Sequence, residues 1–429
     1  MKESINQYAL MALLFVCANT QAQLISWKEN IPSSLEPFQN SPQQLANIVQ
    51  DKIVVYAHPA QRTTIPTSKK NPNPTVTFTS SAIVLPVSTE TIQKTLSQHE
   101  QYVGLFPTLK SAKILEKSAN TTQVKYKISI PTPIPVLNFN EDIIFQHQLG
   151  NNSLSNIVID APVPYGVGKF EWFSVGPNKT LVTLTQWGDL NQPKGFLFSK
   201  ILNAVPEAKL GIPSGTNAFI LESLRKKLST SKSQTLNAGE FPQTDLSSAQ
   251  LDKIALVSKA SQQPVSFIHS SSTVPYQHGR EALRFFSTYQ YYAKTPQQLQ
   301  KWLKPDAYQA IFPRQIKNIQ INKENNQTEN ADFKVSVGLG VITIPFDFKL
   351  KFKYPNTSTN DFYANGGDLK YVKGQMAIKP YQQGSLFEMT TAAKIDDQAP
   401  FLLRAVRSLP YHDVLPAVGA NNVFLLKIK

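Results

Sequence analysis

The sequence predicts an α+β protein made of two tandem units, each a curved antiparallel sheet covered by a C-terminal helix. Two observations lead to this fold class. The two halves of the chain resemble each other at a fixed spacing, and each half passes from β-rich runs to apolar residues at helical spacing. A chain of 429 residues, 41% of them hydrophobic, is long and apolar enough to form more than one core.

The similarity between the halves is strongest around two lysines. The segment KISIPTPIPVLNFNEDIIF, which starts at Lys127, aligns without a gap with KVSVGLGVITIPFDFKLKF, which starts at Lys334. The identical pairs are Lys127 and Lys334, Ser129 and Ser336, Phe139 and Phe346, and Phe145 and Phe352. Upstream, residues 102–107 (YVGLFP) match residues 308–313 (YQAIFP). The same order of matching features in both halves indicates a duplication.

The duplication places a domain boundary in a polar segment. Residues 229–235 read Ser-Thr-Ser-Lys-Ser-Gln-Thr, which is typical of a loop. We therefore expect a first unit at residues 23–232 and a second unit at residues 233–429.

The N-terminus has the features of a secretory signal peptide at residues 1–22. Lys2 precedes an apolar run at residues 9–18, and small and polar residues follow up to Ala22, where we expect cleavage. The apolar run is shorter than the roughly 20 residues that span a bilayer as a helix. The mature protein is expected to be periplasmic or secreted. The single cysteine, Cys17, lies in the segment expected to be removed, so the mature chain has no disulfide framework.

Local patterns predict the elements of the first unit. The β-branched runs at residues 53–58 and 75–85 predict strands, and residues 89–96 predict a short helix before further strands. Apolar residues at helical spacing predict a closing helix at residues 197–205. The sequence GIPSG at residues 211–215 predicts a break before helical residues resume.

The second unit shows the clearest strand. In residues 346–354, aromatic and leucine side chains alternate with aspartate and lysine, so the two kinds of side chain lie on opposite faces. Across the two units, Ser41, Ser247 and Thr295, each followed three residues later by glutamine, predict capping boxes at helix starts. Apolar residues at helical spacing in 402–409 and 423–426 predict the closing helix.

The order of strand, short helices, a run of strands and a C-terminal helix resembles the START-like superfamily, also called SRPBCC or polyketide cyclase-like, in two tandem copies. The most similar piece is the short helix running into Tyr-x-x-Leu/Ile-Phe-Pro at residues 102–107 and 308–313, followed by a Lys-containing strand at residues 110–116. The resemblance implies a helix-grip fold, with the C-terminal helix lying across a curved sheet above an apolar cavity. It also implies sterol, phospholipid, quinone or polyketide-like ligands. It implies no single chemistry, because such folds serve carriers, enzymes and regulators.

The sequence contains no recognisable catalytic constellation. The six histidines are dispersed and form no His-x-x-x-His pair, which predicts no metal site and no cofactor. Glu141 and Asp142 are adjacent on an expected strand, so their carboxylates point to opposite faces and cannot converge on one substrate. The lack of a recognisable catalytic constellation in the sequence favours a binding protein over an enzyme.

The expected partner is a lipid-like small molecule, bound by six residues of the first unit: Tyr102, Phe106, Trp172, Trp187, Phe198 and Leu202. Aromatic side chains on an inward sheet face can also be plain core packing. The sequence therefore predicts an exported binding or carrier protein for an apolar ligand. The alternatives are a cyclase or aromatase-type enzyme, and an interaction module with filled interiors. The net charge of +14 suggests anionic membrane surfaces as a further partner, and no recognised module predicts nucleic-acid binding.

The two units are expected to bind unequally. Pro131, Pro133 and Pro135 remove backbone donors from the central hairpin of the first unit and make it a stiff, apolar rim. Gly338 and Gly340 make the corresponding turn of the second unit more compliant. The aromatic row that follows would fill the second interior. The first unit is thus the predicted ligand site.

Overall fold

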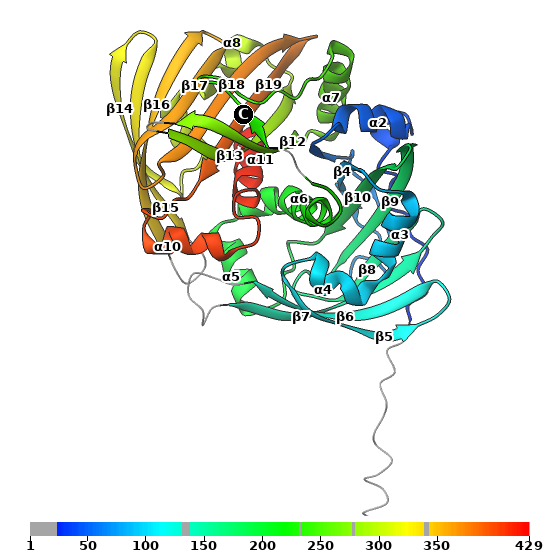
Figure 1. The fold of residues 1–429 in the computed structure, drawn as a ribbon. Helices are drawn as coiled ribbons and strands as arrows, with labels where there is room; N and C mark the ends of the chain where they lie inside the picture. The colour runs from blue at the N-terminus through cyan, green and yellow to red at the C-terminus, as the bar shows by residue number, and fades with distance from the viewer. Residues whose placement is uncertain (1–23, 131–137, 231–232, 277–278, 339–342, 429) are drawn as a thin grey trace, which may run out of the picture.

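The computed structural model describes residues 24–130, 138–230, 233–276, 279–338 and 343–428 (Figure 1). The expected signal peptide lies outside the described residues, as do Pro131, Pro133, Pro135 and Gly340. The chain is a mixed α+β structure with a large antiparallel sheet and several helices, as the sequence predicts.

The N-terminal half contains residues 24–230. Its elements are η1 (Glu36–Phe38), α2 (Pro42–Val49), β1 (Ile53–Ala57), β2 (Gln61–Arg62), β3 (Thr75–Val76), β4 (Thr79–Leu85), α3 (Thr89–Ser97), η2 (His99–Gln101), α4 (Tyr102–Leu105), β5 (Leu109–Lys117), β6 (Thr121–Ile130), β7 (Phe139–Leu149), β8 (Ser153–Asp160), β9 (Gly166–Gly176), β10 (Lys179–Gly188), α5 (Phe196–Ala204) and α6 (Ala208–Leu228).

The C-terminal half contains residues 233–428. Its elements are β11 (Gln234–Thr235), α7 (Ser248–Ser261), β12 (Val265–Tyr276), β13 (Gly279–Tyr292), α8 (Pro296–Leu299), η4 (Gln300–Leu303), η5 (Pro305–Ala307), α9 (Tyr308–Ile311), β14 (Ile316–Asn325), β15 (Thr328–Gly338), β16 (Thr343–Asn356), β17 (Thr359–Gly367), β18 (Tyr371–Tyr381), β19 (Gly384–Lys394), α10 (Phe401–Arg404), η6 (Ala405–Ser408) and α11 (Leu415–Lys427).

The two halves share one continuous sheet, which is antiparallel except for the two-residue β11, which pairs parallel with β12. It is joined in the middle by β1 and β12, which pair from Ile53 opposite Ile268 to Val55 opposite Ser266. Outward from this joint, the N-terminal half runs β1-β4-β10-β9-β8-β7-β6-β5. The C-terminal half runs β12-β13-β19-β18-β17-β16-β15-β14 in the same manner. Each half therefore arranges its strands in the same order about the joint.

Each half is covered by its long C-terminal helix. Leu221 and Leu224 of α6 pack in a core cluster with Trp172 of β9, and Phe424 and Leu425 of α11 pack in a second cluster of the C-terminal half. We call the side of the sheet that faces α6 and α11 the inner face. Figure 1 shows these two helices between the two halves of the sheet, where they also contact each other.

The opposite side of the sheet, the outer face, is covered near the joint by α2 and α7. Leu45 of α2 and Ile254 of α7 share a buried cluster with Tyr56 of β1 and Phe267 of β12. The middle of the molecule is therefore a three-layer structure with the sheet between two layers of helix.

Two local expectations have clear outcomes. In β16, Leu350 and Phe352 are buried whereas Lys349 and Lys353 are exposed, which confirms the predicted alternation. The helix break predicted at residues 211–215 is wrong, because α6 continues through Pro213. Proline in the second turn removes one backbone donor, and packing of the helix on the sheet outweighs that loss.

Candidate ligand-binding site

Three of the six predicted ligand residues lie together in the inner core of the N-terminal half. The Tyr102 ring contacts Phe106 edge-on, with centroids 5.2 Å apart, and stacks on Tyr126 at 5.9 Å. The Tyr102 hydroxyl donates to the carbonyl of Leu96 at 2.6 Å. Trp172 belongs to the same cluster and is fully buried. These side chains hold the short helices against the sheet.

The structure does not bring the two tryptophans together. Trp172 lies opposite Val182, whose side chain belongs to the inner core cluster, whereas Trp187 lies opposite Val167. Val167 belongs to a cluster on the outer face, and Trp187 packs against that cluster. The two tryptophans therefore lie on opposite faces of the sheet.

The remaining two residues lie on α5. Phe198 is half-buried and Leu202 is buried. Next to this helix, Glu207 accepts a bond from Lys427 Nζ at 3.3 Å, so the α5–α6 junction contacts the C-terminal half. The six predicted residues thus occupy three places: the inner core, the outer edge of β10, and α5.

The best candidate for a ligand site is a cleft of about 390 Å³ beside the N-terminal part of α6. It opens between that helix and the ends of β4, β8 and β10, and its walls are largely apolar. The apolar lining includes Phe145, Val158, Val163, Trp187, Leu190, Ile212 and Pro213. Of the six predicted residues, only Trp187 lines it.

Polar side chains stand at the mouth of this cleft. Asp189 is held in place because its carboxylate accepts from the backbone N–H of Asn191 at 2.9 Å and from Gln192 Nε2 at 2.7 Å. Lys209 of α6 donates to Asn191 Oδ1 at 3.2 Å. The cleft therefore combines an apolar interior with a charged and hydrogen-bonding rim, which is typical of small-molecule sites.

A pair of buried histidines lies next to the cleft: the ring centroid of His147 is 6.0 Å from that of Phe145, which lines the cleft. His99 and His147 stack with ring centroids 4.2 Å apart, and His147 Nε2 is 2.9 Å from the Tyr126 hydroxyl. Burial lowers the pKa of His99 to about 4, assisted by the positive charge of Lys117. Burial, and then His99, lowers the pKa of His147 well below its usual value. Sequence reasoning missed this pair, although alternation along β7 places His147 on the same face as Phe145 of the cleft.

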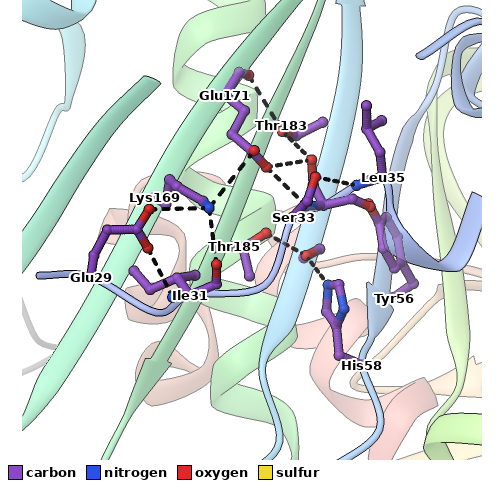
Figure 2. A network of polar contacts seen from close by, with 12 residues as sticks. Glu29, Ile31, Ser33, Leu35, Tyr56, His58, Lys169, Glu171, Thr183 and Thr185 are labelled. Atoms are coloured by element: carbon purple, nitrogen blue, oxygen red, sulfur yellow. Dashed lines mark hydrogen bonds and ion pairs between the residues drawn. The ribbon is translucent and has the colours of Figure 1, made fainter. Parts of the chain in front are cut away.

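The outer face carries a polar network that fastens the N-terminal segment to the sheet (Figure 2). Lys169 of β9 donates to the carbonyl of Ile31 at 2.9 Å, and Glu171 accepts from the backbone N–H and the hydroxyl of Ser34 at 2.8 Å. A similar contact recurs in the C-terminal half, where Lys373 of β18 donates to the carbonyl of Glu240 at 2.7 Å. In each half, the segment that precedes the helix on the outer face, α2 or α7, is anchored to the sheet by a lysine.

A His-Ser-Thr row occurs beside β1 and again beside β12. His58 Nε2 is 2.7 Å from Ser80 Oγ, which is 2.6 Å from Thr185 Oγ1 (Figure 2). The corresponding residues of the C-terminal half are His269, Ser287 and Thr390, with separations of 2.9 and 2.8 Å. Both serines are almost completely buried. Because a substrate cannot reach them there, these rows are structural hydrogen bonds.

Two further features concern the described part of the chain. No group of three or more His, Cys, Asp or Glu residues within it could hold a metal ion. None of the helices in the same residues is both long and apolar enough to cross a membrane.

The interior of the C-terminal half is packed with aromatic rings. Phe333 stacks on Phe348 with centroids 4.7 Å apart, and Phe352 packs against Phe362 at 5.6 Å. Phe424 of α11 meets Tyr308 edge-on at 5.2 Å. Tyr308 belongs to α9 and in turn stacks on Phe333 of β15 at 6.3 Å, so aromatic rings link α11 to the sheet of this half through α9.

Comparisons with known proteins found solved structures that are similar to this chain. Neither a protein-family model nor a curated protein matches the chain. The di-domain aromatase/cyclase StfQ from the steffimycin biosynthetic pathway is 10% identical, covers 81% of this chain and 96% of its own, and has a TM-score of 0.25. The di-domain aromatase/cyclase BexL from the BE-7585A pathway is 6% identical, covers 82% and 97%, and has a TM-score of 0.27. A STAR-related lipid transfer protein from Xanthomonas axonopodis is 14% identical, covers 41% and 92%, and has a TM-score of 0.28.

These are proteins of the START-like class that the sequence resemblance named. Their TM-scores are all below 0.5.

Proposed function

We propose that the chain consists of two tandem helix-grip units, and that the first unit binds an apolar, lipid-like molecule in the cleft beside α6. The arrangement is supported by the identical strand order on both sides of the β1–β12 joint and by a long helix over each half. The single observation that carries the binding role is the cleft of about 390 Å³ with largely apolar walls. That volume lies within the roughly 300–1,000 Å³ of small-molecule pockets.

Burial of apolar surface would supply the affinity. Each methylene that leaves water for the cleft contributes about 0.8 kcal/mol. The aromatic rings that link α11 through Tyr308 to the strands of the C-terminal half favour a packing role for the second unit. The proposed carrier therefore has one binding unit and one supporting unit.

Export and membrane contact belong to the same proposal. A carrier of lipid-like molecules outside the cytoplasm would use the signal peptide expected at residues 1–22, and its net charge of +14 would favour anionic lipid surfaces. N-terminal sequencing of the mature protein tests export: a chain starting at Gln23 supports it, and an intact Met1 contradicts it.

A matched pair of tryptophan variants tests the cleft. Thr216 of α6 lies at the cleft, whereas Leu210 of the same helix is exposed and does not line it. In a titration of the full chain with a fluorescent fatty acid, Thr216→Trp should weaken binding by about tenfold or more, because the indole fills space that the ligand needs. Leu210→Trp should bind like the wild type.

A ligand series separates specific burial from loose surface adsorption. Lengthening a saturated fatty acid by one methylene should tighten binding by about fourfold until the cleft is full. An equal loss of fatty-acid affinity in both tryptophan variants, or no binding by the wild type, would contradict the proposal that the cleft is the ligand site. The latter outcome would favour an interaction module with filled interiors. Turnover of a polyketide-like substrate would favour the cyclase alternative.

A further inference from the structure

We infer that the ligand is amphipathic, with its apolar tail in the cleft beside α6 and an uncharged hydroxylated head group in a second, adjoining chamber. This inference rests on the proposed function and specifies the class of ligand. The second chamber has a volume of about 300 Å³ and lies between residues 65–77 and the turn at residues 189–192. Thr77, Trp187, Asp189 and Asn191 line both spaces.

The wall of the second chamber is an ordered loop. The N–H of Ile65 donates to the carbonyl of Pro72 at 2.7 Å, and the N–H of Thr63 donates to the carbonyl of Pro74 at 3.0 Å. Asn30 of the N-terminal segment accepts from the Thr63 hydroxyl at 2.8 Å and from the N–H of Thr64 at 2.9 Å. The chamber is therefore formed by a loop that is itself fastened to the protein.

The two spaces differ in chemistry. The cleft is lined mainly by apolar residues such as Phe145 and Ile212. The chamber is more polar, because Ser68, Asn71 and Thr75 line it together with apolar residues such as Ile65 and Val76. Trp187 lines both spaces, and its side chain packs against the outer-face cluster of Ile65 and Val76, which also line the chamber. A molecule that fills both would place an apolar portion on one side of Trp187 and a hydrogen-bonding portion on the other.

The charge of the chamber selects among head groups. Of the described residues that line it, Asp189 alone is charged, and no lysine or arginine is among them. Each Asp189 oxygen already accepts one bond from the turn and has a further lone pair for a donor in the chamber. A carboxylate or phosphate head would be repelled by this group, whereas hydroxyl groups can donate to it.

A comparison of two ligands with the same twelve-carbon tail tests the inference on the full chain. The probes are 1-dodecanoylglycerol and dodecanoate, titrated by calorimetry below their aggregation concentrations. The wild type should bind the glycerol ester about tenfold more tightly than dodecanoate. Asp189→Ala should reduce this preference to about threefold or less, because it removes both the acceptor and the repulsion. The control, Asp160→Ala, removes an exposed carboxylate that is paired with Lys194 and lines neither space, so the preference should stay.

Thr75→Trp is an independent variant, because it fills the chamber from the exposed edge of β3. It should lower affinity for the glycerol ester to that for dodecanoate. Equal affinity of the wild type for both ligands would overturn the head-group inference while leaving binding in the cleft intact. Failure of the wild type to bind either ligand would overturn the proposed function itself.

Discussion

Two buried histidines outside the cleft, His58 and His269, have lowered pKa values. His58, beside β1, and His269, on β12, have 1% and 4% of their surfaces exposed, so each imidazole has lost the water that would stabilise its charged form. Burial lowers the pKa of His58 to about 4, helped by the charge of Lys169. Burial lowers the pKa of His269 to about 3, helped by Lys52 and opposed by Asp51. Both side chains are therefore neutral at physiological pH.

These histidines should make stability depend on pH. In the unfolded chain each would bind a proton near pH 6.5, whereas in the folded protein each stays neutral down to about pH 4 or 3. The free energy of unfolding should therefore fall as pH falls from 6.5 toward 4, because the unfolded state binds more protons. In urea unfolding across this range, His58→Asn or His269→Asn should each reduce the slope by up to about 1.4 kcal/mol per pH unit. Slopes equal to that of the wild type would contradict the burial argument.

The placement of side chains on sheet faces could be predicted where alternation is regular. Asp142 pairs with Lys125 at 2.6 Å across neighbouring strands, consistent with the expectation that it and Glu141 point to opposite faces. Trp172 and Trp187 lie in adjacent strands, but the tight turn at Pro177 and Asn178 fixes a register that puts their side chains on opposite faces of the sheet. The face of a strand residue depends on that register, which composition does not reveal.

At the scale of elements, α6 and α11 cross with their backbones in close contact. A Cβ placed on Gly211 would lie 3.0 Å from the Cα of Gly419 and 3.1 Å from its carbonyl oxygen. A Cβ on Gly215, one turn further along α6, would meet nothing within 4 Å. The first glycine allows two helix backbones to approach, and the second does not have this role.

This difference gives a matched pair of alanine variants. Gly215→Ala should raise the free energy of unfolding by about 1 kcal/mol, because alanine is the better helix former. Gly211→Ala should lose this gain and lower stability by about 1–3 kcal/mol, because its methyl group overpacks the crossing. Equilibrium urea unfolding measures both. If Gly211→Ala raised the free energy of unfolding as much as Gly215→Ala does, the overpacking argument at the α6–α11 crossing would be wrong.

Helix starts were more predictable than helix interiors. Ser247 and Thr295 each form the expected capping box, with a reciprocal bond from the glutamine three residues on. Ser41 forms half of the expected box, because it accepts from the N–H of Gln44 while the Gln44 side chain donates to Gln39. Such motifs are local, so the sequence contains all that they need. The continuation of α6 through Pro213 depends instead on tertiary contacts, including the crossing at Gly211. Local propensity alone predicted a break at that place.

At the scale of the whole molecule, the halves are joined by more than the β1–β12 pair. Glu222 of α6 accepts from Arg284 Nη2 of β13 at 2.6 Å, and Arg225 makes an equally short contact with the same carboxylate. All three side chains are buried, and Glu222 is the carboxylate that both arginines share, so removing Glu222 would leave Arg225 buried without its charge partner. The similarity between the halves could be read from the sequence, but this joint could not, because its residues come from distant parts of the chain.

The most direct test of ligand binding in the first unit is photolabelling of the full chain with a fatty acid that carries a diazirine near the end of its tail. Peptide mass spectrometry would locate the adducts. We expect them on cleft residues such as Phe145, Ile212 and Pro213, and we expect unlabelled fatty acid to compete them away. Competable adducts confined to residues 233–428, or adducts that no competitor reduces, would contradict the account.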